Sequence, residues 1–172
     1  MASQEIQKAI QSYENYISNN GIDESVIDAM IEACKVAYQT EKDIPYALKV
    51  SGRTKEIVEQ FVMKLTGADI WGLEKYSQES NQQYDLINKY YDILKMESYY
   101  MFESFIYCME RKRPFKKRFY QPRRKTLKIV VDDLQNLEDR RKQKFFGLSM
   151  PSRVGKSTVC IFFLAYVRWC SL

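Results

Sequence analysis

The chain has 172 residues with no histidine and four scattered cysteines, which argues against a zinc site and a disulfide framework. Residues 1–110 carry 10 Lys and Arg against 18 Asp and Glu, whereas residues 111–172 carry 17 against 4. This asymmetry predicts an anionic partner for the second half, either a nucleotide or a nucleic acid. The longest apolar run, Val159 to Val167, is far shorter than the ~20 residues that span a bilayer, so we expect a cytoplasmic protein without a membrane segment.

The first third of the chain predicts four helices. Apolar residues recur with a helical period over residues 4–19, and Asn20 and Gly21 end that helix. Asp23 or Ser25 caps a second helix. A third helix begins after Asp43 and is broken at residues 51–52, and a fourth covers about residues 54–65.

The pair of helices predicted within residues 44–66 has the outline of a helix-turn-helix. Arg53 and Lys55 would begin its second helix, where residues that read DNA lie. The alternative interpretation is a plain corner between two helices, which the neighbouring acidic residues favour. On either interpretation, residues 1–80 form an α-helical region.

A polar connector at residues 77–83 precedes a long helix that we predict from about Tyr84 to Arg111. Aromatic side chains crowd the predicted helix over residues 81–110. Such a stripe at helical spacing is more typical of a packing surface than of a platform on which bases stack.

The composition then changes to a strongly basic segment at residues 111–125. Pro114 and Pro122 prevent a continuous helix there, so we expect an extended or turning segment. Basic runs bind phosphate backbones without sequence preference. The candidate DNA-binding residues are Arg111, Lys112, Arg113, Lys116, Lys117 and Arg118.

A further helix is predicted over about residues 124–142. Within it, Ile129 to Asp133 imitates the apolar strand and acidic pair of a Walker B motif. The helical spacing through Leu137 favours a different interpretation, in which Asp132 and Asp133 are solvated helix residues.

The most informative segment runs from Phe145 to Thr158, where an apolar strand would turn into a phosphate-binding loop and then a helix. Gly155 would let the backbone approach a phosphate, and the helix N-terminus would supply free N–H groups. Lys156 would contact the β- and γ-phosphates and Ser157 would ligate Mg²⁺. Because Met150 stands where the Walker A pattern has its first glycine, an alternative is that Lys156 is only a solvent-facing lysine.

Together with Phe119 to Arg124, this loop resembles the large subunit of tailed-phage terminases, a family that often has a Pro-Pro-Arg-x-Gly-Lys-Ser loop. The resemblance implies an ATP-driven motor that packages viral double-stranded DNA, cleaves it, and works with a portal and a small terminase subunit. It implies that Arg153 clamps the γ-phosphate, so that Lys156 and Arg153 are the catalytic candidates, with ATP and Mg²⁺ as cofactors. The implied nucleotide-binding residues are Pro151, Ser152, Arg153, Val154, Gly155, Lys156, Ser157, Thr158, Gln121 and Tyr120, with Gln121 and Tyr120 near adenine.

The expected fold is therefore mostly α, an α-helical N-terminal region followed by the opening of an α/β P-loop NTPase at residues 111–172. The acidic strand and nuclease of that family would follow the P-loop, so we expect this chain to be a catalytically incomplete front part of the motor. The main alternative is a small DNA-binding or adaptor protein that uses residues 44–66 and 111–125. A complete small P-loop protein of another kind is a third, weaker interpretation, because too little sheet is predicted.

Overall fold

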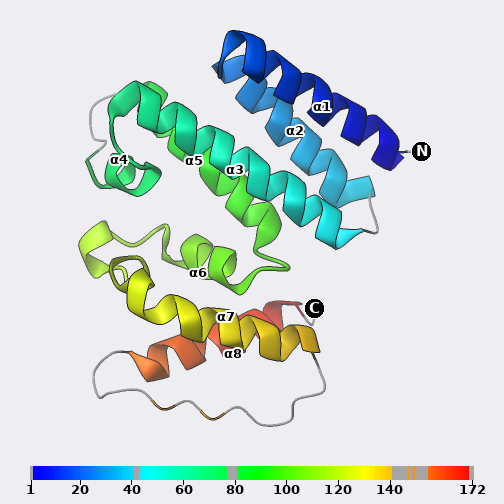
Figure 1. Cartoon of the computed structure of the whole chain (residues 1–172). Helices are drawn as coiled ribbons and strands as arrows, with labels where there is room; N and C mark the ends of the chain where they lie inside the picture. Colours follow the sequence, from blue (N-terminus) through cyan, green and yellow to red (C-terminus); the bar gives the residue numbers. More distant parts are fainter. Residues whose placement is uncertain are drawn as a thin grey trace. The chain divides into compact units, whose positions relative to one another are not determined.

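The computed structural model describes residues 2–40, 43–76, 81–140, 147, 149 and 155–170, and over these residues the chain is mostly helical, as expected (Figure 1). It forms two compact units that follow one another in the chain, residues 1–96 and 97–172. No strand occurs in these ranges. Of the strand expected at residues 145–150, only Gly147 and Ser149 are described, and neither lies in regular structure; the other four residues lie outside the described ones.

Three helices, α1 (Ala2–Asn20), α2 (Glu24–Thr40) and α3 (Ile44–Thr66), lie lengthwise beside one another in the first unit (Figure 1). Their ends agree with the capping residues in the sequence. The carboxylate of Asp23 accepts from the backbone N–H of Val26, and that of Asp43 accepts from the N–H of Tyr46. Gly21 and Gly67 follow α1 and α3 with φ of +85° and +70°, the left-handed conformation that ends helices.

The break predicted at residues 51–52 is wrong, because α3 is one continuous helix through Ser51 and Gly52. Residues 44–66 are therefore neither a helix-turn-helix nor a corner between two helices. Ser51 is buried, and its hydroxyl bonds both the carbonyl of Leu48 and the hydroxyl of Tyr38 on α2. Packing along α2 thus keeps helical a stretch that local propensity alone would interrupt.

Two further helices complete the first unit, α4 (Ile70–Tyr76) and α5, which spans Asn81–Glu97. The sequence pattern did not predict α4. The indole of Trp71 on α4 meets the rings of Tyr90 and Tyr91 on α5 edge to face, with ring centroids 5.5 and 6.4 Å apart. These tyrosines are buried, so this part of the aromatic stripe is packing surface, as predicted.

The single long helix expected over residues 84–111 is also wrong, since α5 ends at Glu97 and α6 covers Phe102–Glu110. Gln135 of the later helix α7 (Arg124–Arg140) bonds the backbone of the intervening turn. Its Oε1 accepts from the backbone N–H of Phe102 at 2.6 Å, and its Nε2 donates to the carbonyl of Tyr100 at 3.1 Å. The boundary between the two compact units lies after residue 96.

The second unit contains α6, two single-turn 3₁₀ helices, η1 (Phe115–Lys117) and η2 (Gln121–Arg123), then α7 (Arg124–Arg140) and α8 (Lys156–Cys170). The helices predicted for α7 and α8 are confirmed. Helices α6, α7 and α8 pack against one another around the buried ring of Phe102, which lies 5.3 Å from the rings of Phe163 and Tyr166. Asp132 and Asp133 are exposed on α7, which confirms that they do not form a Walker B strand.

Among the helices in the described ranges, none has both the length and the apolar composition needed to cross a membrane.

Candidate nucleotide site

The start of α8 carries the residues that the Walker A pattern singles out. Gly155 precedes the helix with φ of +96°, and its carbonyl accepts from the N–H of Val159 at 3.0 Å. Lys156 and Ser157 are exposed in the first turn of α8, and Thr158 is half-buried. The first N–H groups of α8 have no partner within the helix, and a cationic side chain is exposed at the same helix end.

The preceding residues of the predicted loop, Pro151, Ser152, Arg153 and Val154, lie outside the described residues. The clamp role expected of Arg153 stays a prediction.

The aromatic ring of Phe119 lies directly against Gly155. A Cβ atom added to Gly155 would come within 2.0 Å of Cε2 and 2.3 Å of Cζ of Phe119. The guanidinium of Arg123 lies over the same ring, 5.4 Å from its centroid, and donates to the carbonyl of Phe119. The segment at residues 119–123 therefore meets the start of α8, and only glycine fits at position 155.

Glu110, at the end of α6, fixes the backbone of that segment. Its carboxylate is 1 % exposed and accepts from the N–H of Phe119 at 2.6 Å and from the N–H of Tyr120 at 2.9 Å. A buried carboxylate that accepts two backbone N–H groups has its charge compensated by them. Glu110 thereby sets where the Phe119 ring lies.

Tyr120 does not agree with the adenine-contact role expected of it. Its side chain is fully buried, with its ring 5.5 Å from that of Tyr107, and its hydroxyl donates to Glu103 at 2.7 Å. Burial, together with the adjacent Glu103 carboxylate, raises the pKa of Tyr120 far above its ordinary value. Tyr120 is a structural brace, and Phe119 is the aromatic residue beside Gly155.

Arg118 likewise differs from the DNA-binding role expected of it, because its side chain is buried. Its Nε donates to the carbonyl of Arg113, its Nη2 to the carbonyl of Arg111 and its Nη1 to Oε1 of Gln121, at 3.1, 3.2 and 2.9 Å. The buried guanidinium thus fixes the backbone of the basic segment through its bonds to two carbonyls. The other predicted DNA-binding residues are exposed or half-buried: Arg111, Lys112, Arg113, Lys116 and Lys117.

Gln121 has a half-buried side chain, and the oxygen and nitrogen of its amide differ in their hydrogen bonding. Oε1 accepts from Arg118, whereas Nε2 is buried without a hydrogen-bond partner among the described residues. An unpaired buried donor costs about 1–3 kcal/mol, so such a group is rare unless a ligand or water completes it.

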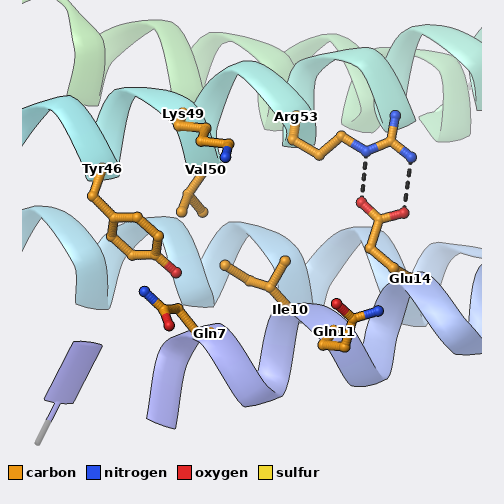
Figure 2. Close-up of a pocket in the computed structure, with 8 residues that line it drawn as sticks. All are labelled: Gln7, Ile10, Gln11, Glu14, Tyr46, Lys49, Val50 and Arg53. Atoms are coloured by element: carbon orange, nitrogen blue, oxygen red, sulfur yellow. Dashed lines mark hydrogen bonds and ion pairs between the residues drawn. The ribbon is translucent and has the colours of Figure 1, made fainter. Parts of the chain in front are cut away.

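A separate hollow of about 530 Å³ lies between α1 and α3 in the first unit, and Figure 2 shows its lining. At one end the guanidinium of Arg53 makes two bonds to Glu14, at 2.6 and 2.8 Å, and a third to Glu56 at 2.9 Å. The Arg53 guanidinium therefore bonds carboxylates within the unit, which argues against the DNA-reading role expected of it.

Several functional contacts could not be found in the sequence. Glu110 gave one local signal, a lone acid directly before the basic segment, but its two N–H partners lie nine and ten residues further on. Arg123 could not be distinguished from the other cations of its run. Its contact with Phe119 depends on the turn at η2, which the sequence predicts only as irregular.

Comparisons with protein-family models, with curated proteins and with solved structures each found no match to this chain.

Proposed function

We propose that the second unit binds a nucleoside triphosphate with Mg²⁺ at the start of α8, as part of a DNA-packaging ATPase of the terminase large-subunit kind. The observation that carries the proposal is Gly155, which has a positive φ and packs on Phe119 immediately before the exposed Lys156 and Ser157. A glycine turn followed by Lys-Ser at a helix N-terminus is the arrangement that cradles phosphates in P-loop proteins.

In this function, Lys156 contacts the β- and γ-phosphates and Ser157 supplies a hydroxyl to Mg²⁺, with Thr158 beside it. Gln121 contacts the base, and Arg123 stacked on Phe119 offers a planar cation near it. The α/β P-loop fold, the γ-phosphate role of Arg153, the packaging of viral DNA in a bacterial cytoplasm, and the portal and small-subunit partners belong to the same proposal.

Calorimetric titration of the purified chain with ATP and Mg²⁺ measures the affinity for the nucleotide and tests this function. Lys156→Ala should weaken ATP binding at least about tenfold, because the variant has no ammonium group to bond the phosphates. Lys112→Ala is the matched control, since it removes an exposed cation elsewhere in the unit and should leave ATP binding unchanged. Equal binding by both variants and the unmodified chain would contradict the proposal.

A second candidate function is binding of DNA through the basic segment. It is favoured by the exposure of Lys112, Arg113, Lys116 and Lys117 on a backbone that the buried Arg118 holds in place. Affinity for duplex DNA should fall steeply as the salt concentration rises. Changing Lys116 and Lys117 to Gln should reduce the slope of log affinity against log salt concentration by roughly one for each phosphate that is no longer neutralised. Lys156→Ala should leave this DNA affinity unchanged, which separates the two functions.

A further inference from the structure

The hollow between α1 and α3 in the first unit has a lining with three distinct parts (Figure 2). At one end, the ion pair between Arg53 and Glu14 joins the two helices. In the middle, Val50 points into the hollow from α3 and Ile10 points into it from α1. Lys49 lies about one helical turn before Arg53 on α3, away from that ion pair. The hollow thus combines an apolar middle with a closed end and a separate cation.

We propose that this hollow binds a small carboxylic acid with an apolar body, such as a medium-chain fatty acid, with its carboxylate at Lys49. All the lining residues belong to the first unit, so the site does not depend on nucleotide binding in the second. Neither the proposed ATP site nor the basic segment uses any of them.

The floor of the hollow is apolar and belongs to the packed part of the unit. Val50 is 4 % exposed, and the half-buried Ile10 packs with Tyr46 against the core between α1, α2 and α3. A ligand that covered this floor would remove apolar atoms from water, on the ligand and on the protein alike. Such burial is the main source of affinity in small-molecule sites, so the ligand should have an apolar body.

The size of the hollow and its closed end favour a small molecule over a segment of protein. Its volume of about 530 Å³ lies within the range of roughly 300–1,000 Å³ that is typical of small-molecule sites. On α1 the lining runs from Gln7 to Glu14, which is about 10 Å at the rise of an α-helix. Because the pair of Arg53 and Glu14 bridges the helices, a ligand lying along the hollow has to end there, whereas a bound helix would continue past it.

Lys49 is the group that selects an anion. Its ammonium forms no ion pair or hydrogen bond with any residue that the structure describes. Arg53, the other cation of the lining, is compensated by Glu14 and Glu56. Both oxygens of Glu14 accept from Arg53, so an amine on the ligand would find no open carboxylate there. The lining therefore favours a simple carboxylate over an amino acid or an amine.

The test measures the affinity of the full chain for octanoate, octanol and octylamine by calorimetric titration. These three probes share one apolar chain and differ in the charge of the head group. We expect octanoate to bind at least about tenfold more tightly than octanol, because a bond between charged groups adds to the same apolar contact. Octylamine should bind no more tightly than octanol. Acetate, which has no apolar chain, should bind at least about a hundredfold more weakly than octanoate.

Lys49→Met is the decisive variant, because it removes the ammonium and keeps an unbranched side chain at an exposed position. It should lower the affinity for octanoate to about that for octanol and leave the affinity for octanol unchanged. Lys64→Met is the matched control, since it removes an exposed cation of the same helix outside the lining and should keep the full preference for octanoate.

Ile10→Phe tests the apolar floor independently of charge. The larger ring should occupy part of the hollow and weaken octanoate and octanol alike, by at least about fivefold. Circular dichroism of the variant shows whether its helix content is retained, and unchanged affinity in a variant that keeps its helices would contradict the proposed site.

Other results would overturn the inference in distinct ways. Equal affinity of the unmodified chain for octanoate and octanol, or no binding of either, would show that the hollow does not recognise a carboxylic acid. An equal loss of octanoate affinity in Lys49→Met and Lys64→Met would reduce the effect to general attraction of an anion to cations of α3. A blocked peptide of alternating leucine and glutamate that bound more tightly than octanoate, and lost its affinity in Lys49→Met, would identify the occupant as a segment of protein.

Discussion

The hydroxyl of Tyr120 donates to the Oε1 atom of Glu103 at 2.7 Å, which ties η2 to the first turn of α6. The same carboxylate receives Arg124 Nε at 2.7 Å and lies 3.4 Å from Lys128 Nζ, both on α7. Glu103 therefore joins three elements of the second unit through one side chain, and Tyr120 belongs to that joint.

Tyr120→Phe should destabilise the chain by about 1.5–3 kcal/mol, the usual contribution of a hydrogen bond to a charged group. The ring would stay in place, so packing against Tyr107 is preserved. Tyr99→Phe, at a half-exposed tyrosine, is the control and should change the free energy of unfolding by less than about 0.5 kcal/mol. Denaturation in urea measures both, and equal effects would show that the bond to Glu103 contributes nothing particular.

Stability should fall in acid because of Glu103. Burial by itself would raise its pKa, but bonds from Arg124 and Tyr120 and the charges of Arg124 and Lys128 lower the pKa below its ordinary value of 4.5. A carboxylate with a lowered folded-state pKa adds stability that is complete above its unfolded pKa and is lost as the pH falls through the folded one. Unfolding free energies measured from about pH 6 to about pH 3 should therefore decline below about pH 4.5.

Glu103→Gln separates this contribution from those of other carboxylates. The variant should be less stable at neutral pH and should show a shallower decline in acid. If the stability of the variant declined as steeply in acid as that of the unmodified chain, another carboxylate would be the cause. One candidate is Glu14, because its bond from Arg53 also lowers its pKa.

Gly155→Ala should destabilise the second unit by at least about 2 kcal/mol and abolish ATP binding. The new methyl group would occupy the space of the Phe119 ring, in a backbone conformation that L-residues rarely adopt. The double variant with Phe119→Ala would remove the clash but not the backbone strain, so it should recover only part of the stability. Full stability of Gly155→Ala in thermal unfolding would show that Phe119 and Gly155 are not held together in solution.

Gly52→Ala should change the free energy of unfolding in the opposite direction to Gly155→Ala. Gly52 lies inside the continuous helix α3, and nothing comes within 4 Å of a Cβ placed there. Alanine should therefore stabilise the first unit by about 0.5–1 kcal/mol. If the chain turned at this position, as the sequence suggested, the same substitution would be neutral or destabilising, so thermal unfolding distinguishes the two structures.

Local signals predicted the ends of α1 and α3, because Gly21, Asp43 and Gly67 act through their own backbone or an N–H three residues away. The same kind of reasoning failed at Ser51 and Gly52. There α3 packs along α2, and the buried Ser51 bonds Tyr38 on that other helix, a contact that the local sequence does not reveal. Likewise, the turn between α5 and α6 is held by Gln135, more than 30 residues further along the chain.

In the candidate site, too, some features could be predicted from neighbouring residues and others could not. The Gly-Lys-Ser signal at the start of α8 could be found because it lies in consecutive residues. The burial of Tyr120 and Arg118 could not, because nothing in a run of aromatic and basic residues distinguishes a side chain that points inward. Only the pairing with Glu103, and with the carbonyls at residues 111 and 113, sets these two apart from their neighbours.

The two compact units occupy consecutive stretches of chain, and each unit packs within its own stretch. During synthesis, the first unit can therefore bury its core before α8 has been made. Helices α1, α2 and α3 pack mainly on their neighbours in the chain, which keeps loop closure short and folding fast. The aromatic core around Phe102 is different, because it has to wait for α8, so the nascent chain would carry that apolar surface exposed for longer than any part of the first unit.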